Sequence, residues 1–449
     1  MGLTKLLALG CAAAACVLAS TDCRRSAPVS PPAGAVPVAT GSGATVVRFG
    51  SVWVNEPRKS TLEKVAAEFR AQHPEIDLRI EYTQPDDYKA AIRTAVAGGD
   101  APDVFFVWPG EWLRKFVRGR QVLDLTDELA KDDWGGRFIP NAKPLFEYRG
   151  RAWGVPMLMQ CAYFLYNKGM FAERGLAPPK TWDELLEVCE TFKREGISPI
   201  GLSNKDKWPL HHYVSILWQR IVGEDRVLDD YDTESEGAFS DPGYLDALRM
   251  VRLFADRGYF SENANGTSRE TFRQLFASER VPIIMTGTWD LGVLQKSDEV
   301  PEGFGDKWDM FPLPEVPGGR GSQAYMMGAP DGYAVWADTK SRDAALTWLR
   351  FLTSPDVAQQ LVSGLQELVC VKGAVNEQTA GDKLLRYATD LEAAPGVTPW
   401  ADIMLESSVR EAYLDSLSGT LDGTVSPEDV LTTLRNAHAK ARAETGTES

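Results

Sequence analysis

The sequence has few residues that suit a metal site or a disulfide framework. Only four of its 449 residues are histidine and six are cysteine. Cys161, Cys189 and Cys370 are widely spaced and odd in number, which fits neither paired disulfides nor the ligand spacing of a zinc site. We interpret them as small buried hydrophobic residues and expect no metal and no other cofactor.

An excess of positive charge is also missing. The formal net charge is −15, which argues against a nucleic-acid partner, because nucleic acids require a basic surface. The sequence contains no Gly-x-Ser-x-Gly elbow, no phosphate-binding loop and no His-Glu-x-x-His motif. We therefore expect a protein that is not an enzyme. An exported carbohydrate-active enzyme is the alternative, since a pair of carboxylates has no local signature.

Beyond its N-terminus, the chain lacks any run of about twenty uncharged apolar residues that would span a membrane. Leu6 to Ala19 is a shorter apolar run that follows Lys5 and precedes small or polar residues. This pattern is typical of an export signal. We assign residues 1–22 to a signal peptide and predict an extracytoplasmic location, in the periplasm or at the cell surface.

Cys23 lies where a bacterial lipoprotein carries its lipidated cysteine, and we predict lipidation there. Asp22 fits the preceding box poorly, so Cys16 as the acceptor and a simply cleaved signal are the alternatives. Residues 23–45 are rich in Pro, Ala, Gly, Ser and Val without periodicity, which predicts a flexible tether. A flexible tether is most useful if its first residue is anchored, which favours lipidation of Cys23. The lipid would then be the only attachment of the protein to the membrane.

The length of the chain favours two domains, because 449 residues exceed one ordinary core. Strand and helix patterns alternate from residue 46 onward. Strands are predicted at 46–54, 76–80 and 104–107. One helix is predicted to begin at Ser60, which forms a capping box with Glu63, and a second helix is predicted over 87–97. This order predicts an α/β fold with parallel strands and helices on both faces.

Polar and aromatic side chains follow each of these three strands. Ligands of such sheets bind beyond the carboxyl ends of the strands. The residues at these ends are Trp53 and Asn55, Gln84 to Asp87, and Trp108. Aromatic rings beside amides and carboxylates suit a polyol, although strand alternation would also allow Trp53 to point into the core.

The alternation continues along the rest of the chain. Residues 223–241 are acidic and rich in turn formers, which predicts a solvated loop. Further strands are predicted at 153–156, 163–166, 283–285, 308–313 and 333–336, and helices at 183–194 (N-cap Thr181), 342–352, 355–364 and in the tail from Asp402.

Several short segments occur in a familiar order and spacing. They are Ala101 to Trp108 (APDVFFVW), Trp153 to Pro156 (WGVP), Tyr166 to Lys168 (YNK), Pro179 to Glu184 (PKTWDE), Met285 to Asp290 (MTGTWD), Gly332 to Val335 (GYAV) and Ala344 to Pro355. Together they resemble the family 1 extracellular solute-binding proteins of bacterial ABC importers, the maltose-binding-protein type. The similarity runs from Val46 to the C-terminus.

The resemblance implies a two-lobe periplasmic-binding-protein fold of type II, in which α/β lobes close on a ligand by a hinge. Residues 46–160 and 330–371 would form the first lobe, and residues 161–329 and 372–449 the second. The crossings would lie near Met159, Pro330 and Val371. The implied function is an extracytoplasmic receptor that binds a carbohydrate, a di- or oligosaccharide, and delivers it to the permease of an ABC importer. A monomer is the default.

The resemblance also implies site residues. Trp289 matches the main stacking aromatic of the second lobe and Trp108 that of the first, while Asn55 and Arg58 lie in the polar ligand loop. Asp290 would accept sugar hydroxyls, or cap a helix. A core role is the alternative for Trp289.

Other candidates lie near the crossings or in a turn of the second lobe. Gln160 would reach the ligand or form an interlobe hydrogen bond. Asp331 would accept a hydroxyl or cap a turn, and Trp208 would contact the ligand. The pair His211-His212 is a poor metal site, because adjacent residues do not share a helix face and only His73 and His438 remain as partners.

A binding protein for a different solute is the main rival. An anion would require Arg or a helix N-terminus at the crevice. A metal would require more histidine, and peptides and polyamines stay open. Several tryptophans at strand ends favour carbohydrate, although the same rings would suit an osmolyte held by cation–π contacts.

Overall fold

The computed structural model describes residues 43–445. The predicted signal peptide, Cys23 and the tether up to residue 42 lie outside the described residues. Within the part described, no helix combines the length and the apolar composition needed to cross a bilayer.

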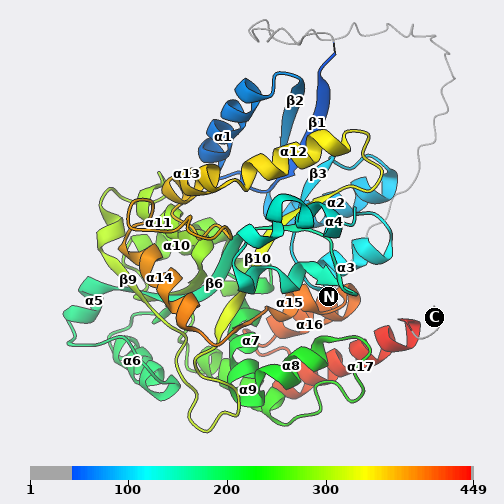
Figure 1. Ribbon diagram of the computed structural model, residues 1–449. Coiled ribbons are helices and arrows are strands. Elements are labelled where there is room, and N and C mark those ends of the chain that lie inside the picture. Colours follow the sequence, from blue (N-terminus) through cyan, green and yellow to red (C-terminus); the bar gives the residue numbers. More distant parts are fainter. Residues whose placement is uncertain (1–42, 446–449) are drawn as a thin grey trace, which may run out of the picture. The chain divides into compact units, whose positions relative to one another are not determined.

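The chain begins with the predicted alternation of strands and helices (Figure 1). Strands β1 (Thr45–Ser51), β2 (Ile76–Tyr82) and β3 (Val104–Val107) run parallel, with β1 in the middle. Helix α1 (Arg58–Gln72) follows β1, and helix α2 (Pro85–Gly98) follows β2. The α/β class and the order of these five elements are therefore confirmed.

The starts of the two helices have different causes. Helix α2 begins with Pro85, whose fixed φ suits a first helical turn, and has Asp86 and Asp87 at its positive end. Helix α1 begins at Arg58, two residues before the predicted cap. Ser60 is therefore not the cap, and its hydroxyl donates to the Pro57 carbonyl.

Two long strands join the halves of the sheet. Strands β6 (Val155–Asn167) and β10 (Met326–Val335) pair antiparallel, and the strand order is β2-β1-β3-β10-β6-β8-β7. The predicted strand at 163–166 and the second half of the one predicted at 153–156 thus belong to a single element. Since β10 is antiparallel to β3 as well, the sheet is mixed rather than wholly parallel.

Helices surround the second half of the sheet. The strands of this half are β7 (Ile200–Gly201), β8 (Ile283–Gly287) and β9 (Trp308–Phe311). The helices that follow β6 in this part of the chain are α5 (Lys168–Ala172), α6 (Trp182–Arg194), α7 (Trp208–Val222), α8 (Glu224–Tyr231), α9 (Gly243–Asp256), α10 (Arg269–Ala277) and α11 (Leu291–Lys296). The predicted cap of α6 is confirmed, because the Thr181 hydroxyl accepts from the Glu184 amide at 3.2 Å. The loop predicted over 223–241 is wrong in part, because α8 occupies its first half.

The C-terminal segments return to both halves. Helices α12 (Arg342–Leu352) and α13 (Pro355–Leu365) lie beside α1 (Figure 1). Helix α17 (Pro427–Thr445) packs against α9, and α16 (Ser407–Ser418) packs against α17 and α7. The remaining elements are α3 (Glu111–Arg118), α4 (Thr126–Ala130), β4 (Glu147–Tyr148), β5 (Arg151–Ala152), α14 (Asp382–Ala393), β11 (Val397–Thr398) and α15 (Ala401–Met404), with short 3-10 turns between them.

The buried side chains form two cores. In the first, Trp348 of α12 packs edge-on against Phe49 of β1 at 5.3 Å and against Phe69 of α1 at 5.0 Å. In the second, Trp218 of α7 stacks on Tyr413 of α16 at 5.3 Å. Two cores are expected for a chain of this length.

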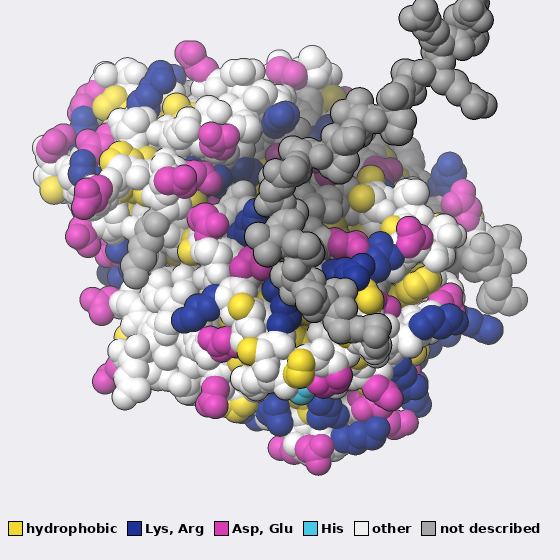
Figure 2. Space-filling model, turned by 90° about the horizontal axis from the view of Figure 1, so that it is seen from above, with side chains coloured by type: hydrophobic (Ala, Val, Ile, Leu, Met, Phe, Trp, Pro, Cys, Tyr) yellow, Lys and Arg dark blue, Asp and Glu magenta, His cyan; other side chains and the backbone are white. Residues whose placement is uncertain are grey.

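The cysteine prediction is confirmed for the described part of the chain. Cys161, Cys189 and Cys370 are buried and none of them forms a disulfide. The surface offers no wide apolar patch among the described residues, where Leu228 is the one large hydrophobic side chain that is exposed. Acidic and basic side chains are interspersed on the face in Figure 2.

Three segments far apart in the sequence meet in the middle of the sheet. Met159 of β6 lies opposite Pro330 of β10. Met159 N–H also donates to the Leu368 carbonyl, and Cys370 N–H donates to the Met157 carbonyl, both at 2.8 Å. These segments contain the positions at which crossings between lobes are predicted.

Candidate ligand-binding site

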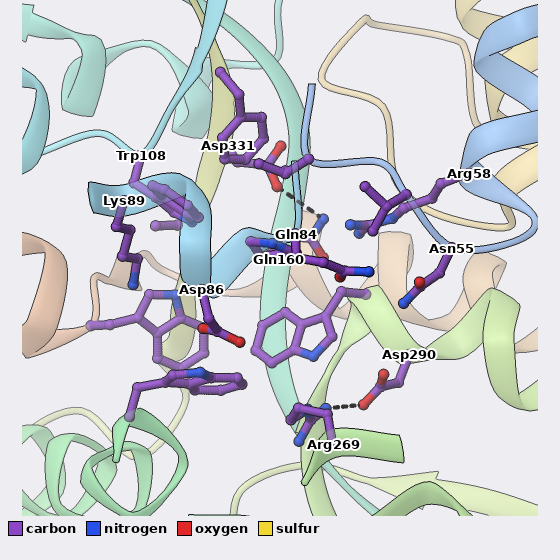
Figure 3. Close-up of a pocket in the computed structure, with 18 of the residues that line it drawn as sticks. Asn55, Arg58, Gln84, Asp86, Lys89, Trp108, Gln160, Arg269, Asp290 and Asp331 are labelled. Carbon is purple, nitrogen blue, oxygen red and sulfur yellow. Dashed lines mark hydrogen bonds and ion pairs between the residues drawn. The ribbon is translucent and has the colours of Figure 1, made fainter. Parts of the chain in front are cut away.

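A cavity of about 270 Å³ opens beside these three segments. Its wall comes from the loop after β1, the start of α2, the end of β3, the middles of β6 and β10, and from α7, α10, α11 and α15. Figure 3 shows Trp108 and Lys89 on one side and Asn55, Arg58 and Asp290 on the other, with Gln84, Gln160 and Asp86 between them.

The ends of the first three strands form one part of the wall, as predicted. Asn55 follows β1, Gln84 and Asp86 follow β2, and Trp108 follows β3, and all four line the cavity. Parallel strands place their carboxyl ends at one edge of the sheet, which is why these residues meet.

Two predicted residues from the same strand ends do not line the cavity. Trp53 is fully buried in the first core, while its neighbours Val52 and Val54 form part of the wall. Side chains of extended backbone alternate, so Trp53 points the other way. Asp87 is exposed outside the cavity, because the turn of about 100° per helical residue directs its neighbour Asp86 inward instead.

A buried polar network lies where the three segments meet. Arg58 forms a two-point ion pair with Glu367, with Nε–Oε1 and Nη2–Oε2 distances of 2.7 and 2.5 Å. The Gln160 amide donates to Glu367 at 3.1 Å and lies 3.5 Å from Asp331 Oδ2, while its own oxygen accepts from Thr288 at 2.8 Å. Gln160 thus contacts the ligand cavity and links β6 to the other two segments.

Asp331 is the member of this network without a cation of its own. Its side chain lines the cavity, and Oδ1 has no hydrogen-bond partner in the described structure. Burial raises the pKa of Asp331 to about 7, against the lowering effect of Arg58. Near neutral pH this carboxyl can therefore offer either an O–H donor or a carboxylate acceptor to a ligand.

Trp108 and Lys89 lie together on one side of the cavity (Figure 3). The Lys89 ammonium lies 4.8 Å from the centre of the Trp108 ring, a cation–π distance, and makes no ion pair within the described structure. Burial lowers the pKa of Lys89. Edge contacts with Phe106 at 4.8 Å and Trp112 at 5.7 Å hold the indole in place.

Four rings form another part of the wall, which we call the aromatic corner: Trp208, His212, Trp289 and Trp400. Trp289 lies edge-on to Trp208 at 5.8 Å and to Trp400 at 6.1 Å. His212 stacks on Trp400 at 4.2 Å, with 15° between the ring planes. Trp208 and Trp289, both predicted from the sequence, are half-buried and line the cavity.

Asp290 lines the cavity, as its predicted ligand role requires, but it does not cap the helix that follows. Its carboxylate forms ion pairs with Arg269 and with Arg273, the latter at 3.3 Å, and accepts from the Thr286 hydroxyl. Burial would raise the pKa of Asp290, but the two guanidinium groups outweigh it and lower the pKa. Since these partners occupy the carboxylate, Asp290 positions Arg269 in the wall, and its side chain makes no cap hydrogen bond to α11.

Sequence reasoning missed several residues of the wall, among them Lys89, His212, Arg269, Trp400 and Asp402. Lys89 had a usable signal, because it lies three residues after Asp86 and so shares its helix face. Trp400 and Asp402 had none, because they reach the cavity from the C-terminal tail.

The pair His211-His212 has a partner that the sequence did not suggest. Asp402 joins it, and donor atoms of the three residues lie within 4.8 Å of one another. His211 Nδ1 lies 3.1 Å from the Ser215 hydroxyl, and Nε2 lies 3.3 Å from Asp402. Lys89 interacts electrostatically with Asp402, and Lys89 and Arg269 do so with His212. Their positive charge opposes the binding of a divalent cation at this cluster.

Comparison with known proteins supports the fold and the family. A maltotriose-binding protein of Pyrococcus abyssi is 27% identical over 359 residues, covering 75% of this chain and 68% of the relative. A multiple sugar-binding protein of Streptococcus mutans is 23% identical over 330 residues, covering 72% and 74%. A solved chitin oligosaccharide binding protein, 19% identical, superposes with a TM-score of 0.81 over 89% of this chain and 99% of that one, which confirms the two-lobe fold.

The model of one protein family, described as bacterial extracellular solute-binding protein, matches residues 53–359. This match covers most of the chain, including every strand from β3 to β10 and most of the cavity wall. The chain belongs to the family of bacterial extracellular solute-binding proteins.

Proposed function

We propose that this protein is the extracytoplasmic receptor of an ABC importer and that it binds a neutral sugar, a di- or oligosaccharide, in the cavity. The observation that carries the proposal is the pairing of indole rings from separate segments with hydrogen-bonding groups. Trp108, Trp208 and Trp289 offer apolar surface for the faces of sugar rings. Asn55, Gln84 and Asp331 offer donors and acceptors for hydroxyl groups.

The cations in the wall argue against a cationic ligand. Arg269 lies 5.1 Å from the centre of the Trp208 ring, and Lys89 lies 4.8 Å from that of Trp108. A cationic osmolyte would bind to the faces of these indole rings, where the two cations already lie. Repulsion between the osmolyte and these side chains would oppose its binding. A sugar agrees with the relatives, which are a maltotriose-binding protein, a multiple sugar-binding protein and a melibiose/raffinose/stachyose-binding protein.

The lobes that close on the ligand are proposed to be residues 46–160 with 330–371, and residues 161–329 with 372–449. Their support is the meeting of β6, β10 and residues 368–371, the three segments in which the crossings are predicted. A ligand that contacts both lobes stabilises the closed state by its higher affinity for that state.

Localisation and partners follow from the same proposal. The mature protein would be held at the membrane by a lipid on Cys23, would act as a monomer and would deliver the sugar to permease subunits. The family consists of binding proteins, which supports a protein without enzymatic activity. A Cys23→Ser variant expressed in a bacterial host should move from the membrane fraction to the soluble fraction, and an unchanged distribution would contradict lipidation.

The main test is a ligand screen with the purified protein. Maltotriose, raffinose, chitin-derived oligosaccharides and monosaccharides are compared with amino acids, polyamines and phosphate in thermal unfolding. A ligand at 100 times its dissociation constant should add about 2.7 kcal/mol to the free energy of unfolding. A sugar hit without turnover in chromatography supports the proposal. Hits only among the other solutes would contradict the sugar assignment, and cleavage of the sugar would contradict a pure receptor.

A further inference from the structure

His212 is a buried histidine whose ring has no polar partner. It lies on α7 with 5% of its surface exposed and lines the cavity. Neither ring nitrogen forms a hydrogen bond or ion pair with any residue that the structure describes. Neither of its nitrogens is among the fully enclosed polar atoms that lack a partner, so the ring edge is open to the cavity, from which a ligand can reach it.

The two neighbouring histidines differ in this respect. His211 points to the protein interior, where Ser215 and Asp402 lie 3.1 and 3.3 Å from its two nitrogens. His212, one residue on, is rotated by about 100° around the helix axis and faces the cavity with Trp208, which precedes it by four residues.

The aromatic corner fixes the orientation of the His212 ring. One face lies against Trp400 at 4.2 Å, and Trp208 and Trp289 lie at 4.9 and 6.0 Å. The nitrogen atoms on the ring edge are therefore the part of the imidazole that remains for a ligand.

The charges around His212 keep the imidazole neutral. Burial and the neighbouring His211, Arg269 and Lys89 lower the pKa of His212 well below its usual value, against the opposite effect of Asp402. A neutral imidazole has one N–H donor and one nitrogen acceptor. This combination matches hydroxyl groups, which both donate and accept.

We propose that His212 is the specificity-determining residue of the cavity and that its ring edge hydrogen-bonds hydroxyl groups of the sugar ring seated in the aromatic corner. The proposal rests on the proposed function and adds the group that recognises hydroxyl positions. The tryptophans of the corner supply contact area for any pyranose, whereas His212 distinguishes sugars by where their hydroxyls lie.

The test uses His212→Phe, which keeps a flat ring against Trp400 but removes both nitrogens, and His212→Gln, which restores a donor and an acceptor. Calorimetry with the tightest-binding sugar of the panel should show a loss of affinity of roughly 10- to 100-fold for the Phe variant, as for lost hydrogen bonds. The Gln variant should recover part of it. Without ligand, the Phe variant should unfold at the wild-type temperature or above it.

His438→Phe is the matched control. His438 is also buried, but its Nε2 lies 2.9 Å from the Asp232 carbonyl oxygen and it does not line the cavity. This variant should lose unliganded stability and keep wild-type affinity, the reverse of His212→Phe.

The outcomes separate the two proposals. If the wild-type protein binds no sugar, both fall. If it binds sugar and His212→Phe binds it equally well, only the role of His212 is overturned, and a lower unliganded stability of the Phe variant would then assign the histidine to the fold. Stabilisation of the wild type, but not of His212→Phe, by Zn²⁺ alone would overturn the proposal in favour of a metal site with His211 and Asp402.

Discussion

Arg58 and Glu367, which are 309 positions apart in the chain, form a buried two-point ion pair. The side chains are 17% and 3% exposed. Asp331 adds a second carboxyl to the same network, so within the described part of the chain Arg58 serves two acids. This ion pair ties the start of α1 to the chain just before residues 368–371, the third of the segments that meet beside the cavity.

Loss of the guanidinium should therefore be costly. We expect Arg58→Met to lower the free energy of unfolding by roughly 3–5 kcal/mol, because it leaves a buried carboxylate unpaired. Urea denaturation at pH 7.5 measures the change. Arg79→Met is the control, since Arg79 pairs with Asp77 at the surface with 59% of its side chain exposed, and should cost at most about 1 kcal/mol. Equal losses in the two variants would contradict a special role of the buried pair.

The raised pKa of Asp331 predicts a pH-dependent stability. The folded state holds this proton up to a pH of about 7, whereas the unfolded chain releases it near pH 4, so the contribution of Asp331 to stability is fully present below pH 4 and is lost as pH rises to 7. Asp331→Asn removes the titrating group. The variant should gain stability over the wild type as pH rises from 4 to 8, by at most roughly 4 kcal/mol.

Urea denaturation of both proteins across this pH range, without ligand, tests the prediction. A difference between them that stays constant from pH 4 to pH 8 would show that folding does not raise the pKa of Asp331.

Wall and core tryptophans should separate binding from stability. Trp108→Ala and Trp289→Ala should weaken sugar binding at least tenfold, about 1.4 kcal/mol, because stacking area is lost from half-buried rings. Trp53→Ala should instead lower the free energy of unfolding by about 3–5 kcal/mol, since its ring is fully buried. Calorimetry and thermal unfolding of the three variants measure both effects. Weaker binding by a stable Trp53→Ala variant would place Trp53 at the ligand after all.

Gly287 gives room to the Trp289 ring. A Cβ atom at Gly287 would lie 1.9 Å from Cζ3 of Trp289, so Gly287→Ala must displace the indole. We expect this variant to lose sugar affinity and to shift its tryptophan fluorescence. Gly98→Ala, which meets no heavy atom within 4 Å, is the control and should keep wild-type affinity. Unchanged binding by Gly287→Ala would show that the ring position does not matter.

Local patterns predicted most of the elements, and the failures have identifiable causes. The bounds of β3 and α12 match the prediction, because a short apolar run and a regular apolar face are local signals. Strand β6 was divided into two, since a strand buried along its whole length shows no alternation. Helix α8 was missed because its acidic, turn-rich sequence resembles a loop.

The sequence by itself determined the α/β class, the family resemblance and the strand ends that supply Asn55 and Trp108, because each depends on neighbouring residues or on an order of motifs. Only the tertiary structure decided that Trp53 belongs to the core, that Asp290 is held by two arginines and that Trp400 completes the aromatic corner. These facts depend on which distant segments pack together. The free energy that selects this packing comes from burying both cores at once, and no local stretch of the sequence carries it.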